Sequence, residues 1–228
     1  MPKAGLDAAT VTRAAAEVVD EVGYAGLTMG LVADRLGVRA PSLYKHVAGQ
    51  ADLSRRIAVL AVTEIGDALR DSLQGKSDGQ ALEAAAHTTR RYARDFPGRF
   101  AATLYNTPTG PGDPLHLAWA RVVDSHLAIL SGYKIPEEDT RHALLLLRSF
   151  LDGFSLIEPV GDMHTEDEIY ASFLWVIGFV DRGLRELSRV TPSAAAAVRE
   201  VTSGPAGKRT ATASSSVRSG RTAQQPPS

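Results

Sequence analysis

Apolar residues recur every three or four positions along most of the chain up to about residue 190, and the alternation of β-branched residues that marks strands is missing. This spacing places the apolar side chains on one face of an α-helix. The pattern therefore predicts an all-α protein. The expected helices cover residues 8–22, 29–36, 38–47, 52–73, 79–95, 98–105, 114–131, 136–157 and 165–187.

Local residues mark several of the expected helix ends. Asp7 and Thr28 stand where N-caps belong, and Gly37 stands where the second helix would stop. Thr165 and Glu168 have the spacing of a capping box, in which each side chain bonds the backbone of the other residue. This pair predicts the start of the last long helix.

Composition divides the chain into three parts. We expect an N-terminal domain over residues 1–51, a larger helical domain over 52–190, and a tail over 191–228 that is rich in Ala, Ser, Thr, Gly, Pro and Arg. The tail has too few apolar residues to bury a core, so it is expected to be largely disordered. The net charge of the whole chain is -1, which by itself would not suggest a nucleic-acid partner.

Composition also limits the class of protein. The 228 residues are 44% hydrophobic and 22% charged, as in soluble globular proteins, and the absence of cysteine excludes disulfides and thiol chemistry. The longest uncharged apolar stretch, residues 169–180, is too short to span a bilayer. Residues 1–9 show no signal-peptide pattern. A soluble, cytoplasmic protein without a membrane partner is expected.

Residues 28–47 have the most informative spacing. Two short helices are joined at Gly37, with the small Ala33 four residues before it and Leu43 six residues after it. A small residue lets the helices cross closely and the glycine forms the turn, as in a helix-turn-helix. An ordinary helical hairpin in a bundle has the same spacing, so the spacing alone leaves both interpretations open.

Three stretches in and around this segment are distinctive: GYAGLTM at 23–29, VADRLGV at 32–38 and PSLYKHV at 41–47, followed by Asp52 and Leu53. Together they resemble the TetR family of transcriptional regulators. The resemblance implies a three-helix DNA-binding domain, a connecting helix and a helical domain that binds a small-molecule effector. It also implies a homodimeric repressor of a palindromic double-stranded DNA operator. Val47 and Gln50 depart from the family pattern, in which phenylalanine and a phosphate-binding lysine are common.

Roles in DNA binding can be assigned within the motif. The second helix enters the major groove, and its first residues meet base edges. Arg39 suits a bidentate pair with guanine, whereas Lys45 suits a phosphate. His46 has packing or capping as an alternative role, and Tyr44 has a place in the core as its alternative. The expected DNA-contacting residues are Thr28, Arg39, Ala40, Pro41, Ser42, Tyr44, Lys45, His46 and Gln50.

A histidine interrupts an apolar helix face in the second domain. His126 follows Trp119 and Val122 at helical spacing. A lone histidine on such a face is either a core residue or a polar contact in a ligand pocket. The pocket hypothesis adds Tyr92 and Tyr105 as lining candidates and suggests a hydrophobic or aromatic effector.

The last two long helices are the expected dimer interface. Residues 169–180 are apolar almost all round, so this helix needs cover on more than its core side. A two-fold, four-helix interface between residues 136–157 and 165–187 of two copies would supply that cover. Phe173 and Val180 are expected to point outward into it.

The segment 144–157 resembles the region that names the WHG subgroup of TetR C-terminal domains, although only Gly153 of the tripeptide is present. Within this segment, Arg148 and Asp152 stand four residues apart, which predicts a salt bridge on the helix surface.

Enzyme interpretations find no support in the residues. Gly153-Phe-Ser-Leu-Ile157 lacks the second glycine of a nucleophile elbow, and the six histidines show no metal-ligand spacing. No catalytic residue, metal or cofactor is therefore expected. A ligand-independent DNA-binding regulator and a helical interaction module that never touches DNA remain open as alternatives.

Overall fold

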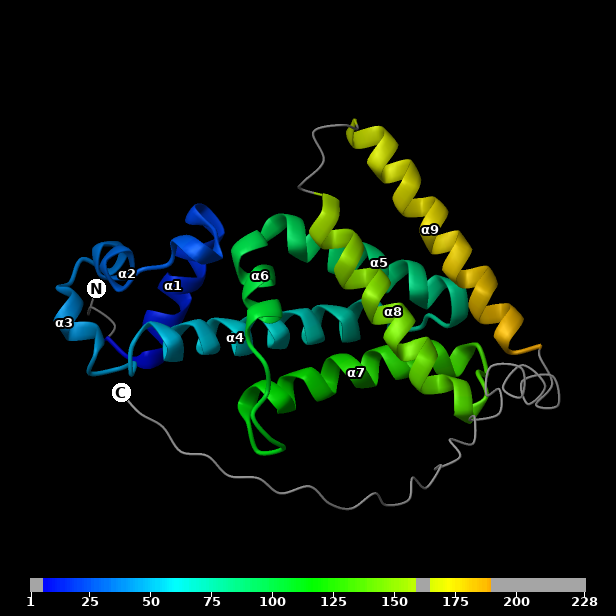
Figure 1. The fold of residues 1–228 in the computed structure, drawn as a ribbon, viewed down its shortest axis with the longest axis horizontal. Coiled ribbons are helices and arrows are strands. Elements are labelled where there is room, and N and C mark those ends of the chain that lie inside the picture. Colours follow the sequence, from blue (N-terminus) through cyan, green and yellow to red (C-terminus); the bar gives the residue numbers. More distant parts are fainter. Residues whose placement is uncertain (1–5, 159–164, 190–228) are drawn as a thin grey trace, which may run out of the picture. The chain divides into compact units, whose positions relative to one another are not determined.

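A computed structural model describes residues 6–158 and 165–189, and the regular elements in these ranges are all helical (Figure 1). The all-α prediction is confirmed. The expected tail at 191–228 lies outside the described residues. The helices are α1 (Ala8–Val22), the short 3-10 helix η1 (Tyr24–Gly26), α2 (Met29–Leu36), α3 (Ala40–Leu43), α4 (Gln50–Ser72), α5 (Asp78–Asp95), α6 (Pro97–Tyr105), α7 (Pro114–Gly132), α8 (Glu137–Ile157) and α9 (Glu166–Leu187).

The helix caps lie where the sequence predicts them. The Asp7 side chain accepts a hydrogen bond from the backbone N–H of Thr10 at 2.7 Å. Gly37 ends α2 in the left-handed conformation with φ of 64°, which costs glycine no steric strain. Thr165 and Glu168 form the complete capping box at the start of α9. These ends are set by local contacts, which explains why the sequence alone located them.

The middle of the N-terminal domain differs from the prediction in two boundaries. The second helix of the motif is only four residues long as a regular α-helix, and Tyr44 to His46 continue it as turns. The connecting helix begins at Gln50 rather than at Asp52. The reason is that the Asp52 carboxylate accepts a hydrogen bond from the backbone N–H of Ala48 at 2.9 Å, which holds the chain in position before the first turn of α4.

Helix α4 joins the two domains. It contacts α1, α5, α6 and α7, and Leu53 and Ile57 in its first half are fully buried. Helix α6 lies against both α1 and α4. The contact with α1 is so close that a Cβ atom built on Gly98 would lie 2.0 Å from the backbone oxygen of Val19. Only glycine fits at this crossing.

Helices α8 and α9 bury one face each against the rest of the domain. The buried face of α9 contains Phe173 and Val180, whose side chains are only 2% and 5% exposed. The expectation that these two residues point outward is therefore wrong. The outward face of α9 instead presents Trp175 and Phe179, which are 64% and 58% exposed. No helix in the described part of the chain is both long and apolar enough to cross a membrane.

Candidate nucleic-acid interface and ligand pocket

Helices α2 and α3 form a tight turn with a shared apolar core. The backbone N–H groups of Gly37 and Val38 donate to the carbonyl oxygens of Asp34 and Ala33 at 3.1 and 3.0 Å. Ala33 is 2% exposed and Leu43 is fully buried. The small residue and the glycine thus have the roles that the spacing indicated, and they hold α3 in a fixed orientation on α2.

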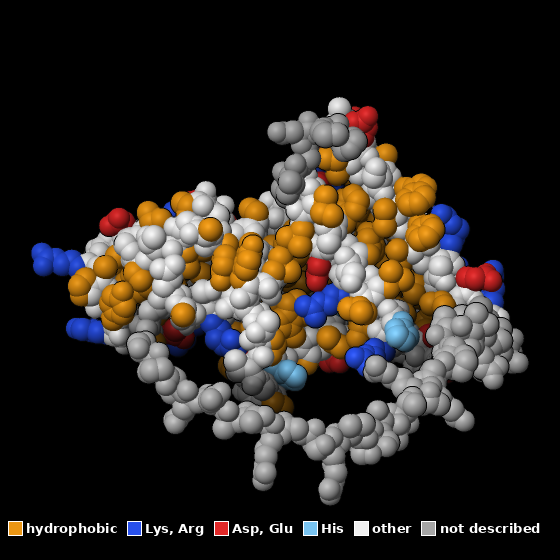
Figure 2. Space-filling view, viewed as in Figure 1, with side chains coloured by type: hydrophobic (Ala, Val, Ile, Leu, Met, Phe, Trp, Pro, Cys, Tyr) orange, Lys and Arg blue, Asp and Glu red, His pale blue; other side chains and the backbone are white. Residues whose placement is uncertain are grey.

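The residues expected to meet DNA lie mostly on the surface around α3. Arg39, at the N-cap of α3, and Lys45, in the turns after it, are exposed, and neither makes an ion pair with a described residue. Figure 2 shows Lys and Arg side chains projecting from the end of the molecule where α3 lies. Thr28, Pro41 and Tyr44 are exposed as well, whereas Ala40, Ser42 and His46 are partly buried. Exposed cations without a protein partner are free to bind an anionic ligand such as DNA.

Two of the expected DNA contacts also have structural roles. The Thr28 hydroxyl accepts a hydrogen bond from the backbone N–H of Leu31 at 3.2 Å and caps α2. The amide nitrogen of Gln50 donates to the backbone oxygen of Leu27 at 2.8 Å. Gln50 therefore connects the start of α4 to the segment before α2, and one of its two amide N–H groups is already hydrogen-bonded within the protein.

A cavity of about 510 Å³ lies between α7 and α8. It brings together three of the five residues expected to bind a ligand, namely Trp119, Val122 and His126. The residues that α8 contributes were not predicted, because their partnership with α7 depends on how the two helices pack. The full lining is Trp119, Val122, Val123, His126, Arg141, His142, Leu144, Leu145 and Arg148.

His126 is the most unusual residue of this cavity. It is only 3% exposed, and neither ring nitrogen has a hydrogen-bond partner among the described residues. Burial, together with a smaller effect of the positive charge of Arg148, lowers the pKa of His126 to about 4. The imidazole is therefore neutral near pH 7. It combines features of both earlier interpretations, since it is buried like a core residue but lines a cavity.

Arg148 forms a wall of the cavity. Its guanidinium lies 4.1 Å from the centre of the Trp119 ring, a cation–π arrangement. The predicted pair with Asp152 is present, with Nε and Oδ2 separated by 3.3 Å. Burial raises the pKa of the Asp152 carboxyl above its ordinary value, and the attraction of Arg148 opposes that shift.

The structure places Tyr92 and Tyr105 away from this cavity. The Tyr92 hydroxyl donates to the Glu64 carboxylate at 2.6 Å, and burial with this contact raises the Tyr92 pKa. Tyr105 is 72% exposed and stacks on Tyr24 of the N-terminal domain, with ring centres 4.9 Å apart. A role in ligand binding for either tyrosine would need a different site.

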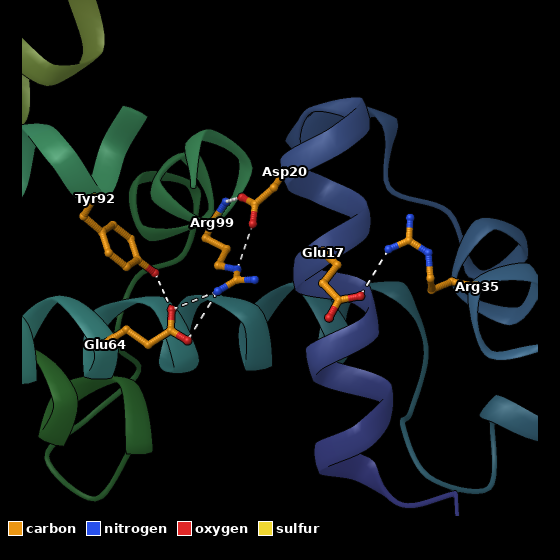
Figure 3. Close-up of polar contacts among 6 residues, drawn as sticks. All are labelled: Glu17, Asp20, Arg35, Glu64, Tyr92 and Arg99. Carbon is orange, nitrogen blue, oxygen red and sulfur yellow. Dashed lines mark hydrogen bonds and ion pairs between the residues drawn. The ribbon is translucent and has the colours of Figure 1, made fainter. Parts of the chain in front are cut away.

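A polar network that the sequence did not predict connects the two domains (Figure 3). Arg99 of α6 pairs with Asp20 of α1 and with Glu64 of α4, and Glu64 accepts the Tyr92 hydroxyl of α5. The one available signal was Glu64, a carboxylate on an otherwise apolar stripe of α4. A partly buried carboxylate among apolar side chains is stabilised by a polar partner.

A second cavity, of about 650 Å³, lies where α1, α4 and the start of α7 meet. Several of the charged groups in its lining already pair with each other. Arg55 binds Asp113, and Arg56 binds Asp52 with a separation of 2.9 Å between Nε and Oδ2. These pairs leave fewer unmatched polar groups for a ligand than the cavity between α7 and α8 offers.

Known families match both domains. Residues 11–57 match the model for bacterial regulatory proteins of the tetR family, and residues 82–180 match the model for the tetracyclin repressor-like C-terminal domain. The chain is also 32% identical over 165 residues to an uncharacterised HTH-type transcriptional regulator of Mycobacterium tuberculosis, across 72% of this chain and 75% of that protein. The chain belongs to the TetR family of transcriptional regulators.

Other TetR-family relatives agree with this assignment. The tetracycline repressor protein class A from transposon 1721 of Escherichia coli is 29% identical over 163 residues, which cover 67% of each chain. A TetR variant from Acinetobacter baumannii, solved in complex with minocycline, superposes with a TM-score of 0.62 at 22% identity, over 81% of this chain and 99% of that one. A TetR regulator from Streptomyces coelicolor gives a TM-score of 0.63 at 20% identity, over 80% of this chain and 99% of that one. At these identities, the two structures show that the fold is shared.

TetR-family membership decides between the interpretations of the 28–47 segment. The segment is a DNA-binding helix-turn-helix, and the protein is a transcriptional regulator of a non-enzymatic family. The match over 82–180 is to the tetracyclin repressor-like model and gives no support to the WHG resemblance at 144–157.

Proposed function

We propose that this TetR-family regulator is a repressor that binds a palindromic operator as a homodimer and releases it when a small hydrophobic or aromatic molecule occupies the cavity between α7 and α8. One observation supports the proposed response to a ligand. Val122 lines the cavity and also packs on α4, where a Cβ atom built on Gly66 would lie 3.4 Å from the Val122 Cγ2 atom. A ligand that displaces Val122 would therefore press on the helix that joins the two domains.

The homodimer is supported by the outward faces of α8 and α9. Large apolar side chains gather there, and Figure 2 shows hydrophobic groups along both helices on the face in view. Monomeric proteins rarely leave so contiguous an apolar surface uncovered. Its most exposed members are Leu145, Leu146, Ile157, Tyr170, Leu174, Trp175 and Phe179.

Operator binding by a dimer sets a geometric requirement. Two copies of α3 must enter successive major grooves on one face of the DNA, with centres about 34 Å apart. Arg39 and the first residues of α3 would meet base edges in each half-site, and Lys45 would meet a phosphate. The operator is then expected to have two-fold symmetry, because the proposed homodimer would have it.

Helix α4 is the proposed link between ligand and DNA. It contacts α1 of the DNA-binding domain, and at Gly66 it packs against Val122 of α7. A small tilt of α4 would change the distance between the two α3 helices of a dimer. Linkage requires that a ligand weakening DNA binding 100-fold bind the DNA-free form about 2.7 kcal/mol better.

The minocycline complex of the Acinetobacter protein shows a small molecule bound to a protein of the same fold. This supports the binding of a small molecule by the present protein.

The test has two stages. Selection from a random DNA pool with the purified protein should yield a sequence with two-fold symmetry. A hydrophobic compound library, screened by thermal shift, should then yield compounds that release this DNA in a gel-shift assay. Calorimetry should show that the operator and such a compound weaken each other's binding by the same factor. A symmetric operator together with no thermal shift from any compound would instead favour a ligand-independent regulator.

A further inference from the structure

The cavity between α7 and α8 is apolar on its walls and positive at its polar positions. Trp119, Val122 and Leu144 supply apolar surface, whereas Arg141 and Arg148 supply positive charge. No carboxylate is among the described residues that line the cavity. A neutral hydrophobic ligand would leave this charge unused.

The two arginines differ in how much of their charge is available. Arg148 already pairs with Asp152, and its guanidinium lies over the Trp119 ring. Arg141 is exposed and makes no ion pair with any residue that the structure describes. Among the described residues that line the cavity, Arg141 is therefore the arginine whose charge is available, and Arg148 with Trp119 offers a surface suited to a ring.

His126 supplies an independent sign of a ligand. It is 3% exposed and lines the cavity, yet both of its ring nitrogens lack a hydrogen-bond partner among the described residues. A buried polar group without a partner is costly. A neutral imidazole offers one donor and one acceptor, so a ligand with a polar group at this depth would remove the cost.

We propose that the effector is an organic acid: a carboxylate joined to an aromatic or alicyclic body, with the carboxylate bound by Arg141, the body against Trp119 and Arg148, and a polar group of the ligand bonded to His126. This inference rests on the proposed function, because it assigns the effector site to this cavity. It adds the charge and the chemical class of the ligand.

Calorimetry with two matched probes tests the assignment. Biphenylacetate and biphenylacetamide have the same shape, but only the first is charged near pH 7. The acid should bind the full-length protein at least about tenfold more tightly than the amide. Arg141→Gln should remove this preference by weakening the acid about tenfold while leaving the amide unchanged. Arg121→Gln, at an exposed position on α7 outside the cavity lining, is the matched control and should change neither affinity.

His126→Phe provides a second measurement that does not depend on charge. It fills the space of the imidazole without its nitrogens, so a phenylacetate that carries a hydroxyl on its ring should lose affinity relative to the unsubstituted compound. Both compounds should keep their dependence on Arg141 in this variant. Circular dichroism would confirm that each variant is folded.

Three outcomes would overturn the inference: equal affinity for the acid and the amide, an acid affinity unaffected by Arg141→Gln, or no binding of either probe. Gel shifts with the selected operator separate this inference from the proposed function. If a neutral compound releases the DNA and no acid does, the ligand class is wrong and the ligand-responsive repressor stands. If the acid binds through Arg141 but leaves the DNA complex intact, the ligand class stands and its proposed effect on DNA fails.

Discussion

Arg99, at the start of α6, binds Asp20, near the end of α1, with both its backbone and its side chain. Its backbone N–H donates to Asp20 Oδ1 at 2.9 Å, and its Nε lies 2.8 Å from Asp20 Oδ2. The two side chains are only 15% and 13% exposed. Burial raises the pKa of the Asp20 carboxyl, while the contacts with Arg99 oppose that shift. A carboxylate near a helix C-terminus interacts unfavourably with the helix dipole, and the positive charge of Arg99 offsets this interaction as well.

Besides α4, this pair is one of the contacts that join the DNA-binding domain to the C-terminal helical domain. Arg99 also reaches Glu64, with 3.3 Å between Nη1 and Oε2, so one guanidinium holds carboxylates on α1 and α4. Because α6 contacts α1, α4 and α5, a movement within the C-terminal helical domain would change the position of α1 through α6. The orientation of the DNA-binding domain therefore depends on contacts with α6 as well as on the connecting helix α4.

Replacing Arg99 should cost far more stability than replacing an exposed arginine. Arg99→Met leaves Asp20 buried without its cation, and we expect the free energy of unfolding to fall by about 3 kcal/mol. Arg35→Met is the matched control, because Arg35 also binds carboxylates of α1, Glu17 and Glu21, but at the surface. It should cost less than about 1 kcal/mol. Urea denaturation measures both free energies of unfolding. Equal losses of stability in the two variants would contradict the inference that the buried pair contributes more than the exposed one.

Two substitutions should separate base recognition from phosphate binding. Arg39→Ala should weaken binding to the preferred operator by about 1–3 kcal/mol and relax the base preference. Lys45→Ala should weaken binding to all DNA sequences alike. It should also reduce the slope of log affinity against log salt concentration by about one. Arg70→Ala, which removes an exposed arginine from the last turn of α4, should change neither. Gel-shift titrations at several salt concentrations give these quantities, and unchanged affinity in the first two variants would exclude α3 as the reading helix.

Charge placed on the outward face of α9 should separate the subunits. Trp175→Glu and Phe179→Glu put a carboxylate where the dimer would bury an aromatic ring, so dissociation constants should rise at least roughly 100-fold. Leu117→Glu is the control, since this leucine of α7 is 56% exposed but lies outside α8 and α9. Light scattering with circular dichroism should show a folded dimer for the control and the wild type. A folded wild-type monomer would refute the proposed interface.

Phe173→Glu should behave differently from these surface variants. The Phe173 side chain is 2% exposed and packs on Phe154, with ring centres 5.1 Å apart. A carboxylate there would be buried without a partner, so the expected result is unfolding rather than dissociation. Loss of helical signal in circular dichroism would confirm this, and a folded monomer would contradict it.

His126 should make the protein sensitive to acid. Its pKa is about 4 in the folded protein and about 6.5 in an unfolded chain. Because the unfolded chain binds the proton first, stability is lost as the pH falls from about 6.5 towards 4, by up to roughly 3 kcal/mol. His126→Leu lacks this group and should gain stability relative to the wild type over that window. Urea denaturation at pH 7 and pH 4.5 measures the gain, and parallel pH profiles would show that His126 does not titrate as inferred.

The helix-turn-helix and the helix caps could be predicted because their signals are local. Thr28 bonds a backbone group three residues away, and Gly37 takes its left-handed conformation within a single turn. The grouping of Trp119, Val122 and His126 was also correct for a local reason, since helical spacing alone puts them on one side of α7. Such features depend on residues only a few positions apart, and the sequence contains all of that information.

Contacts between distant helices were decided by the tertiary structure. Nothing near Gly98 indicates that Val19 will pass within van der Waals reach of it, and nothing near Tyr92 indicates that it will meet Glu64 rather than the cavity. In α9, a helix that is apolar almost all round has no polar face to show which side is inward, so Phe173 and Val180 were assigned to the wrong side. The sequence determined which residues form helices and where those helices end, because backbone hydrogen bonding and capping are short-range. Only packing determined the rotation of each helix about its axis, because that rotation minimises the exposed apolar surface of all the helices together.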